Sequence, residues 1–237
     1  MTIHIVMMSK GGVGKSLVAI LLAQYLKARG RAPYCIDTDP VSGTFHSYRE
    51  LEAEHIDVMA DDMSIDLSRF DPVIERLIEH PGDCVVDTGP STFFPLLGYL
   101  ARNDVFALLK SYGKRVIIHA PIVGGQGMDA TIRGLCALLQ FRTSIIVWEN
   151  DYFGPVEKDG RRFEKSEIFR SAGGQIIGVA KLFQRDPDTR GKDISLMTTR
   201  RLTFATMMEL PEILLIQRRR YARAWQQITH TLNQIGI

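Results

Sequence analysis

Cysteine is scarce in this chain. Only Cys35, Cys84 and Cys136 occur among 237 residues, far apart and odd in number. Because each lies in an apolar segment, we expect three buried free thiols. The sequence has no Cys-x-x-Cys pair, and its six histidines are dispersed. These absences argue against a metal site or an iron–sulfur cluster built from cysteine and histidine within one chain.

Long apolar runs are also missing. No stretch has the length and composition of a membrane-spanning helix, and the N-terminus lacks the charged, apolar and small-residue order of a signal peptide. We therefore expect a cytoplasmic protein with no stable membrane insertion. With 45% hydrophobic and 24% charged residues, the chain suits a soluble protein, and residues 1–237 are interpreted as one domain.

The chain has little net charge, only +2, but the charge is unevenly distributed. From Lys181 to the end there are ten Lys and Arg against five Asp and Glu, whereas the first 180 residues hold nineteen against twenty-two. A basic last quarter is a candidate surface for non-specific DNA binding.

The most informative stretch is Lys10–Ser16, which reads KGGVGKS. It follows the apolar segment Ile3–Met8 and precedes Leu17–Lys27, whose apolar residues suit a helix. A strand, a glycine-rich loop and a helix form the context of a phosphate-binding loop, because glycine lets successive N–H groups turn toward an anion. The residues that this motif assigns to nucleotide binding are Gly11, Gly12, Val13, Gly14, Lys15, Ser16 and Leu17.

Two lysines and a serine give this loop its chemistry. Lys15 brings a positive charge to the outer phosphates, and Ser16 offers a hydroxyl ligand to phosphate-bound Mg²⁺. The common motif G-x-x-x-x-G-K-[ST] has glycine where this chain has Ser9, and Lys10 is an additional lysine. The sequence predicts nucleotide binding with Mg²⁺, against the alternative of a glycine-rich turn beside a solvated lysine.

Acidic residues follow two further apolar strands. The strand at 34–36 leads to Asp37 and Asp39, and the strand that begins at Cys84 ends at Asp87. Open parallel sheets bind ligands at the carboxyl ends of their strands, so these carboxylates are candidate site residues. Asp87 has the form of a Walker B aspartate, which holds Mg²⁺ or its waters. The alternative is a strand that ends on a capping aspartate.

The rest of the chain alternates strands and helices, which predicts an α/β fold with a twisted, mostly parallel sheet covered by helices on both faces. Strands are predicted at 116–120, 144–148 and 175–180, and helices at 72–80, 93–112, 128–141, 163–171 and 211–235. Residues 41–66 are interpreted as a mobile connection with short helical pieces, 152–162 as a hairpin-like excursion, and 183–201 as a polar segment with turns at Asp186-Pro187 and Arg190-Gly191.

Asn150 follows one of these strands, where its amide can pair with an adenine edge or can form a turn. Gly124, Gly125 and Gly127 lack a Gly-Lys-Ser continuation and indicate a tight strand-to-helix turn rather than a second phosphate site. In the closing helix, the basic residues Arg218, Arg219, Arg220 and Arg223 can face DNA or a membrane. We favour the alternative of a helix packed on the sheet with solvated arginines.

These features together resemble the deviant Walker A ATPases, the P-loop NTPase group that includes ParA and MinD. A narrower resemblance is to the TraL proteins of conjugative plasmids, and it lies in the segments Cys35–Phe45, Val85–Phe93, Val147–Gly160 and Arg200–Arg220. TraL proteins are ParA-like ATPases encoded with DNA-transfer genes. The chain departs from the ParA pattern at Val41-Ser42, where ParA proteins usually have Gln-Gly, and after Asp87.

The resemblance implies roles for single residues. Lys10 would reach across an ATP-dependent homodimer to the partner's nucleotide, and Lys15 and Asp39 would complete the catalytic set, with Asp39 orienting the attacking water. Asp37 and Asp87 would lie beside Mg²⁺ together with Ser16, and Asn150 would contact adenine. The implied function is a Mg·ATP-dependent switch with slow hydrolysis, accessory to conjugative DNA transfer and acting with proteins of the conjugation machinery.

Two other functions stay open. One is a ParA-like ATPase that positions or partitions DNA. The other is a P-loop kinase or ligase that acts on a small metabolite. The kinase would need a second concave site for its substrate, which the sequence does not identify.

Overall fold

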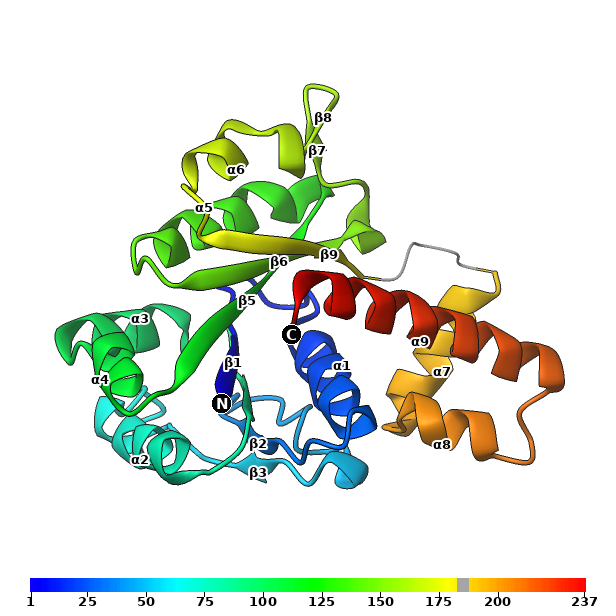
Figure 1. Ribbon diagram of the computed structural model, residues 1–237, viewed down its shortest axis with the longest axis horizontal. Coiled ribbons are helices and arrows are strands. Elements are labelled where there is room, and N and C mark those ends of the chain that lie inside the picture. Colours follow the sequence, from blue (N-terminus) through cyan, green and yellow to red (C-terminus); the bar gives the residue numbers. More distant parts are fainter. Residues whose placement is uncertain (183–187) are drawn as a thin grey trace.

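The computed structural model of the protein describes residues 1–182 and 188–237, and these are organised around a seven-stranded sheet (Figure 1). The strand order is β3-β2-β4-β1-β5-β6-β9, and every pair in this sheet is parallel. The strands are β1 Thr2–Val6, β2 Tyr34–Asp37, β3 Glu54–His55, β4 Cys84–Asp87, β5 Arg115–Val123, β6 Ser144–Asn150 and β9 Ile176–Lys181. The predicted parallel α/β fold is therefore confirmed.

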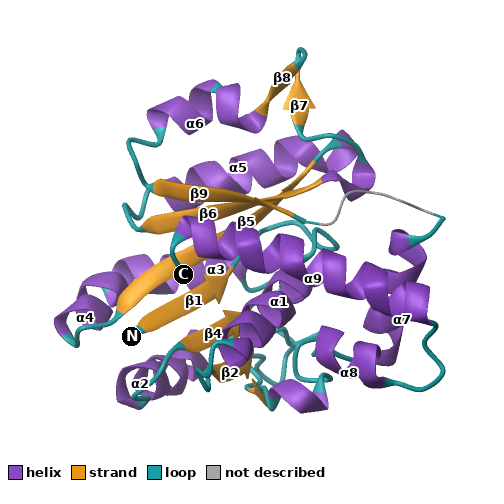
Figure 2. Cartoon of the chain, turned by 45° about the vertical axis from the view of Figure 1, so that its right-hand side comes forward, coloured by secondary structure: helices purple, strands orange, loops and turns teal. Residues whose placement is uncertain are grey.

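Side chains from successive residues of each strand point to opposite faces, and both faces are apolar. In β1, Ile3 and Ile5 enter one apolar cluster, while Val6 enters the other. Both clusters are closed by helices, as Figure 2 shows. The sheet is thus buried on its two sides, which explains why its strands read as continuous apolar runs.

One face is covered by α2, α3, α4, α5 and α6, and the other by α1, α7, α8 and α9. α9 lies along β9 and beside α1, whose Tyr25 donates a hydrogen bond to Asn233 of α9 at 2.8 Å (Figures 1 and 2). The helices are α1 Lys15–Ala28, α2 Asp71–Glu79, α3 Phe93–Arg102, α4 Val105–Ser111, α5 Met128–Leu139, α6 Glu167–Ser171, α7 Arg190–Arg200, α8 Phe204–Glu209 and α9 Leu215–Ile235.

The irregular segments agree in part with the predictions. Residues 41–66 contain the short 3₁₀ helix η1 Arg49–Leu51 and also β3, which was not predicted. The excursion after β6 holds an antiparallel ribbon of β7 Glu157–Lys158 and β8 Arg161–Arg162, as expected for a hairpin. No helix in the described ranges is long and apolar enough to cross a bilayer.

Three predictions were wrong. The segment after residue 189 is helix α7 and not a turn at Arg190-Gly191, because buried contacts to α9 hold it; the predicted turn at Asp186-Pro187 lies outside the described residues. The last helix begins at Leu215 and not at 211, because Pro211 lies in the turn that follows α8. Cys136 is exposed on α5, whereas Cys35 and Cys84 are buried.

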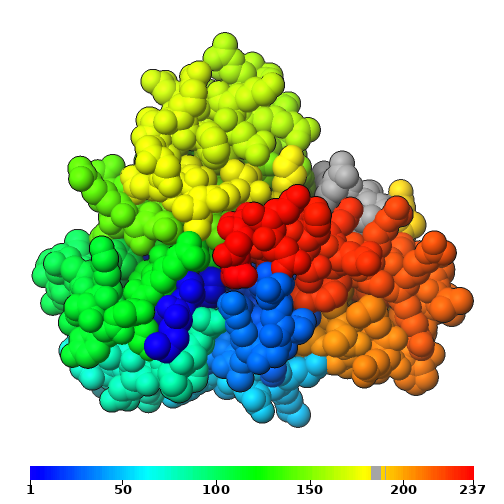
Figure 3. Space-filling view, in the orientation of Figure 1, coloured from blue at the N-terminus to red at the C-terminus, as the bar shows by residue number. Residues whose placement is uncertain are grey.

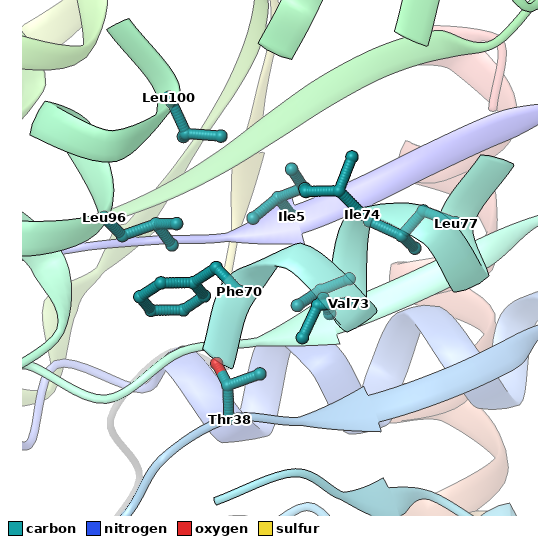
Figure 4. Close-up of a pocket in the computed structure, with 9 residues that line it drawn as sticks. Ile5, Thr38, Phe70, Val73, Ile74, Leu77, Leu96 and Leu100 are labelled. Atoms are coloured by element: carbon teal, nitrogen blue, oxygen red, sulfur yellow. The ribbon is translucent and has the colours of Figure 1, made fainter. Parts of the chain in front are cut away.

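A small cavity lies between the sheet and α2 and α3. Its volume is about 20 Å³, and its walls include Ile5, Phe70 and Leu96, whose side chains point toward one another in Figure 4. This space holds little more than one water molecule, and its walls are almost entirely apolar. The cavity is therefore a packing defect of the core and not a substrate site.

Candidate functional site

The carboxyl ends of three adjacent strands bring the predicted acidic residues together. Asp87 is the register partner of Val6 in β1 and of Asp37 in β2. The three strand ends therefore lie at one level, and the chain after Val6 continues into the glycine-rich loop. Thr38 strengthens this junction, because its N–H and hydroxyl both donate to the backbone oxygen of Asp87 at 2.9 and 3.0 Å.

The loop between β1 and α1 has the backbone that its glycines predict. Gly12 and Gly14 have φ angles of 74° and 98°, in the left-handed region that favours glycine. Gly14 also caps α1, and Val18 donates the first helical hydrogen bond to its carbonyl at 2.9 Å. Within the described residues, the backbone N–H groups at positions 11–17 donate no hydrogen bond. These donors at a helix N-terminus form a cradle for an anion.

The two lysines of the loop differ in environment. Lys15 is 6% exposed, and its Nζ donates to the carbonyl of Lys10 at 3.2 Å. Burial lowers the pKa of Lys15, and the negative charges of Asp87 and Asp39 oppose that shift. Lys10 itself is exposed. Lys15 therefore faces the acidic strand ends, while Lys10 is exposed to solvent.

Asp87 is the least satisfied polar group of the site. Its side chain is fully buried, and neither carboxylate oxygen has a partner with hydrogen-bond geometry among the described residues. Burial raises the pKa of Asp87 to about 8; the nearby Ser16 hydroxyl and Lys15 lower it, while the charge of Asp37 raises it further. An unpaired buried carboxylate is costly unless a cation or donor meets it.

This arrangement fits Mg²⁺ delivered with a nucleotide. Mg²⁺ is usually held by one or two protein oxygens together with phosphates and water. The side chains of Asp87 and Ser16 can supply these oxygens. No group of three or more metal-ligating side chains occurs in the part of the chain that the structure describes. A metal at this position would therefore depend on the phosphates for its remaining ligands.

Asp37 and Asp39 are held by the loop that follows β2. The carboxylate of Asp37 accepts from the N–H groups of Asp39 and His46, both at 2.9 Å. Asp39 accepts from the N–H of Val41 at 3.0 Å and from the hydroxyl of Ser42 at 2.7 Å. Both carboxylates are buried at the strand ends next to the loop that carries Lys15.

Asn150 ends β6 and contacts the phosphate-binding loop itself. Its Nδ2 donates to the carbonyl of Val13 at 3.0 Å, and its Oδ1 accepts from the N–H of Tyr152 at 3.1 Å. One N–H and one lone pair of the amide remain for another partner. The contact with adenine stays a prediction, and the link between β6 and the loop is a feature that the sequence did not indicate. Leu17, also assigned to the nucleotide, lies half-buried in the first turn of α1.

A buried histidine pair beneath the site was also missed. His4 and His119 join through Nδ1 and Nε2 at 2.9 Å, and the indole of Trp148 donates to His119 at 2.9 Å. Burial lowers the pKa of His4 to about 4 and lowers the pKa of His119 well below its usual value. Both histidines are therefore neutral at pH 7 and serve packing between the sheet and α1.

The basic residues of the last quarter divide into two groups. Arg220 pairs with buried Asp193 of α7, and Arg218 donates to the carbonyls of Ile213 and Leu210 at 3.0 and 2.7 Å. Arg219 and Arg223 are exposed. Figure 3 shows these last helices as one orange-to-red region of the surface beside α1. Half of the predicted arginine cluster therefore holds the helices together.

A family profile and two known proteins are similar to this chain. The family profile of the CobQ/CobB/MinD/ParA nucleotide binding domain matches residues 4–234. Two Escherichia coli relatives, each named Protein TraL, are similar over nearly their whole length. One is 37% identical over 221 residues, covering 92% of this chain and 91% of the relative. The other is 35% identical over 238 residues, covering 99% and 98%.

Solved structures show the shared fold. The MinD cell division protein of Aquifex aeolicus has a TM-score of 0.57 and 15% identity, covering 99% of this chain and 97% of that one. A putative plasmid partition protein of Borrelia burgdorferi, bound to AMPPNP, has a TM-score of 0.50 and 16% identity, covering 98% of both chains. At these identities the likeness extends to the fold alone.

Proposed function

Because the chain belongs to the CobQ/CobB/MinD/ParA nucleotide-binding family and resembles TraL proteins over nearly its full length, we propose that it is an ATPase. It binds Mg·ATP, hydrolyses it slowly to ADP and phosphate, and changes its association state between the two nucleotides. Residues 1–237 act as one domain in the cytoplasm. The observation that carries the proposal is the buried, unpaired carboxylate of Asp87 beside Ser16 and Lys15, at the mouth of an open anion cradle.

Each residue has a defined task in this proposal. The N–H groups of Gly11, Gly12, Val13 and Gly14 bind phosphate oxygens, and Lys15 neutralises charge on the outer phosphates. Asp39 orients the water that attacks the terminal phosphorus. Phosphoryl transfer requires mainly positioning and charge stabilisation, and these side chains supply both.

A bound Mg²⁺ would be held by Ser16 and Asp87, with Asp37 behind them, and would withdraw charge from the phosphate oxygens. The acidic groups of Asp39 and Asp87 act on the buried Lys15, and Asp37 acts on Asp87, so a cation is favoured there. Asn150 positions the loop through Val13 and offers its remaining N–H and lone pair to adenine.

Lys10 is the residue through which a second subunit would act. It is exposed at the rim of the cradle, in contrast to Lys15. In an ATP-bound homodimer, Lys10 would reach the nucleotide of the partner, and hydrolysis would depend on dimerisation. A charge donated in trans to a phosphoryl-transfer site contributes on the order of 10³ or more in rate.

The TraL relatives support a role as an accessory to conjugative DNA transfer, together with proteins of the transfer machinery. Partition or positioning of DNA is the neighbouring candidate, supported by the partition protein among the solved structures that share this fold. Exposed Arg219 and Arg223 supply a surface for direct DNA binding in either case. A small-molecule kinase or ligase is less favoured, and ADP release that rises on addition of a metabolite would support it.

The direct test is ATP binding and ADP release by wild type, Lys15→Ala and Lys27→Ala. Lys15→Ala removes the buried cation, so both binding and turnover should fall by at least about tenfold. Lys27 lies in the last turn of the same helix, and its Nζ donates to the carbonyl of Glu50 far from the cradle, so Lys27→Ala should behave as wild type. Equal ATP binding by wild type and Lys15→Ala would rule the proposal out.

A further inference from the structure

The loop after β2 carries Ser42, whose hydroxyl has no role in the phosphate or metal binding proposed above. Ser42 follows Asp39 by three positions, and its Oγ donates to Oδ2 of Asp39 at 2.7 Å. The other oxygen, Oδ1, accepts from the N–H groups of Val41 at 3.0 Å and Ser42 at 3.4 Å. The carboxylate that would orient the attacking water is thus held at both oxygens.

The turn after Asp87 also packs against this carboxylate. Gly89 lies so near that a Cβ atom built on it would be 2.7 Å from Oδ1 and 3.0 Å from Cγ of Asp39. Asp39 is 6% exposed. The side chain is therefore wedged between its own loop and Gly89, and its remaining freedom is rotation of the carboxylate plane.

The hydrogen bonds that Asp39 accepts show which of its lone pairs remains free. A carboxylate oxygen accepts about two hydrogen bonds. Both positions of Oδ1 are taken by backbone N–H groups, and one position of Oδ2 is taken by Ser42. A single position on Oδ2 remains, and its direction is set by the Ser42 hydroxyl.

We propose that Ser42 is a positioning residue for hydrolysis: it fixes the carboxylate of Asp39 so that the remaining lone pair of Oδ2 faces the attacking water. This inference rests on the proposed ATPase function. Without the hydroxyl, the carboxylate is held at Oδ1 alone, its plane can rotate about the Cβ–Cγ bond, and the water loses its alignment. The effect belongs to turnover and not to ATP affinity, because the hydrogen bonds of Ser42 within the described residues go to Asp39 and not to the cradle or Lys15.

The experiment measures kcat, KM and ATP affinity for Ser42→Ala and Ser42→Thr. Ser42→Ala should lower kcat about tenfold, the worth of one hydrogen bond to a charged group, with KM and affinity unchanged. Ser42→Thr keeps the hydroxyl and should recover most of kcat. Ser47→Ala is the matched control, because its hydroxyl donates to the carbonyl of Thr44 at 2.6 Å in the same loop without touching a carboxylate.

A second variant separates positioning from a general effect on the loop. In an Asp39→Ala background, Ser42→Ala should cause no further loss, because the hydroxyl acts only through that carboxylate. An unchanged or faster kcat in Ser42→Ala, a failure of Ser42→Thr to recover, or an added loss in the double variant would overturn the inference. Absence of ATP hydrolysis in wild type would instead remove the proposed function, and this inference with it.

Discussion

Asp37 and Asp87 are register partners at the ends of the neighbouring strands β2 and β4. Of the two, only Asp37 has hydrogen-bond donors for its carboxylate within the described residues. Asp37 fixes the loop after β2 through the N–H groups of Asp39 and His46. Asp87 is buried without such donors and has a raised pKa. The pair therefore divides into an acid that stabilises the fold and an acid that is poised for a cation.

This division predicts opposite effects of two isosteric substitutions. Asp87→Asn removes the cost of a buried carboxyl and should raise the free energy of unfolding of the nucleotide-free protein by on the order of 2 kcal/mol, while weakening Mg²⁺-dependent ATP binding. Asp37→Asn should lower the free energy of unfolding, because the amide NH₂ would face a backbone N–H donor. Chemical denaturation measures both, and a destabilised Asp87→Asn protein would speak against a poised carboxylate.

The left-handed glycine of the loop gives a second prediction. Gly14→Ala forces a strained φ, and the new Cβ would lie 3.2 Å from Leu182 Cδ1 and 3.3 Å from Asn150 Nδ2. ATP affinity should fall by at least about tenfold because the cradle is distorted. Gly30→Ala has a similar positive φ in open space after α1 and should cost stability without affecting the affinity measured by titration calorimetry. Equal affinities of the two variants would contradict this assignment.

The buried histidine pair makes stability depend on pH. The folded-state pKa of His4, about 4, lies below the unfolded value, so the unfolded chain takes up the proton first. Its contribution to stability is complete above about pH 6.5 and is lost as the pH falls toward 4. Between about pH 7.5 and 5, wild type should lose about 2 kcal/mol relative to His4→Gln.

A comparison of two variants isolates the His4–His119 pair, because titrations away from that pair, including that of Asp87, cancel in the difference. His230 lies on α9, away from the buried pair, so His230→Gln should show the same pH dependence as wild type. A His4→Gln protein whose unfolding free energy tracks wild type across this range would show that His4 is not a buried neutral base.

The exposed arginines of α9 should carry the direct DNA binding proposed above. Replacing Arg219 and Arg223 by alanine should lower affinity for random-sequence duplex and reduce the slope of log K against log salt by about 2, because two fewer phosphates are neutralised. Exposed Lys110 on α4, at the opposite face of the sheet, provides the control in Lys110→Ala. A salt response that is flat in wild type would exclude phosphate contacts by this surface.

Local patterns predicted much of this molecule. The KGGVGKS loop and the aspartates at strand ends can each be recognised from a few neighbouring residues. The structure brings these residues to one sheet edge. Helix α7 was missed because its buried face is defined by distant partners: Asp193 meets Arg220, and its backbone carbonyl accepts from Tyr221 at 2.7 Å. The same holds for Asn150 and Val13, which are 137 positions apart. Such contacts leave no periodic trace in the sequence.

Cys136 illustrates a different limit. Its nearest neighbours on α5 are apolar, but Cys136 shares the exposed side of the helix with Arg133, while Leu135 and Leu138 enter the core. Apolar neighbours in the sequence therefore predict a helix with an apolar face. Which side chains lie on that face depends on how the helix is rotated about its axis.

In the proposed switch, ATP closes two subunits over the site, and Asp39 is needed to reopen them by hydrolysis. Sedimentation velocity of wild type, Lys10→Ala and Asp39→Ala, each with ATP and Mg²⁺ and with ADP, tests this most directly, with ADP release measured on the same samples. We predict that Asp39→Ala accumulates as a dimer with ATP, that wild type returns to monomer as ATP is consumed, and that Lys10→Ala loses turnover. Monomeric Asp39→Ala at saturating ATP, with Lys10→Ala hydrolysing at the wild-type rate, would contradict the switch.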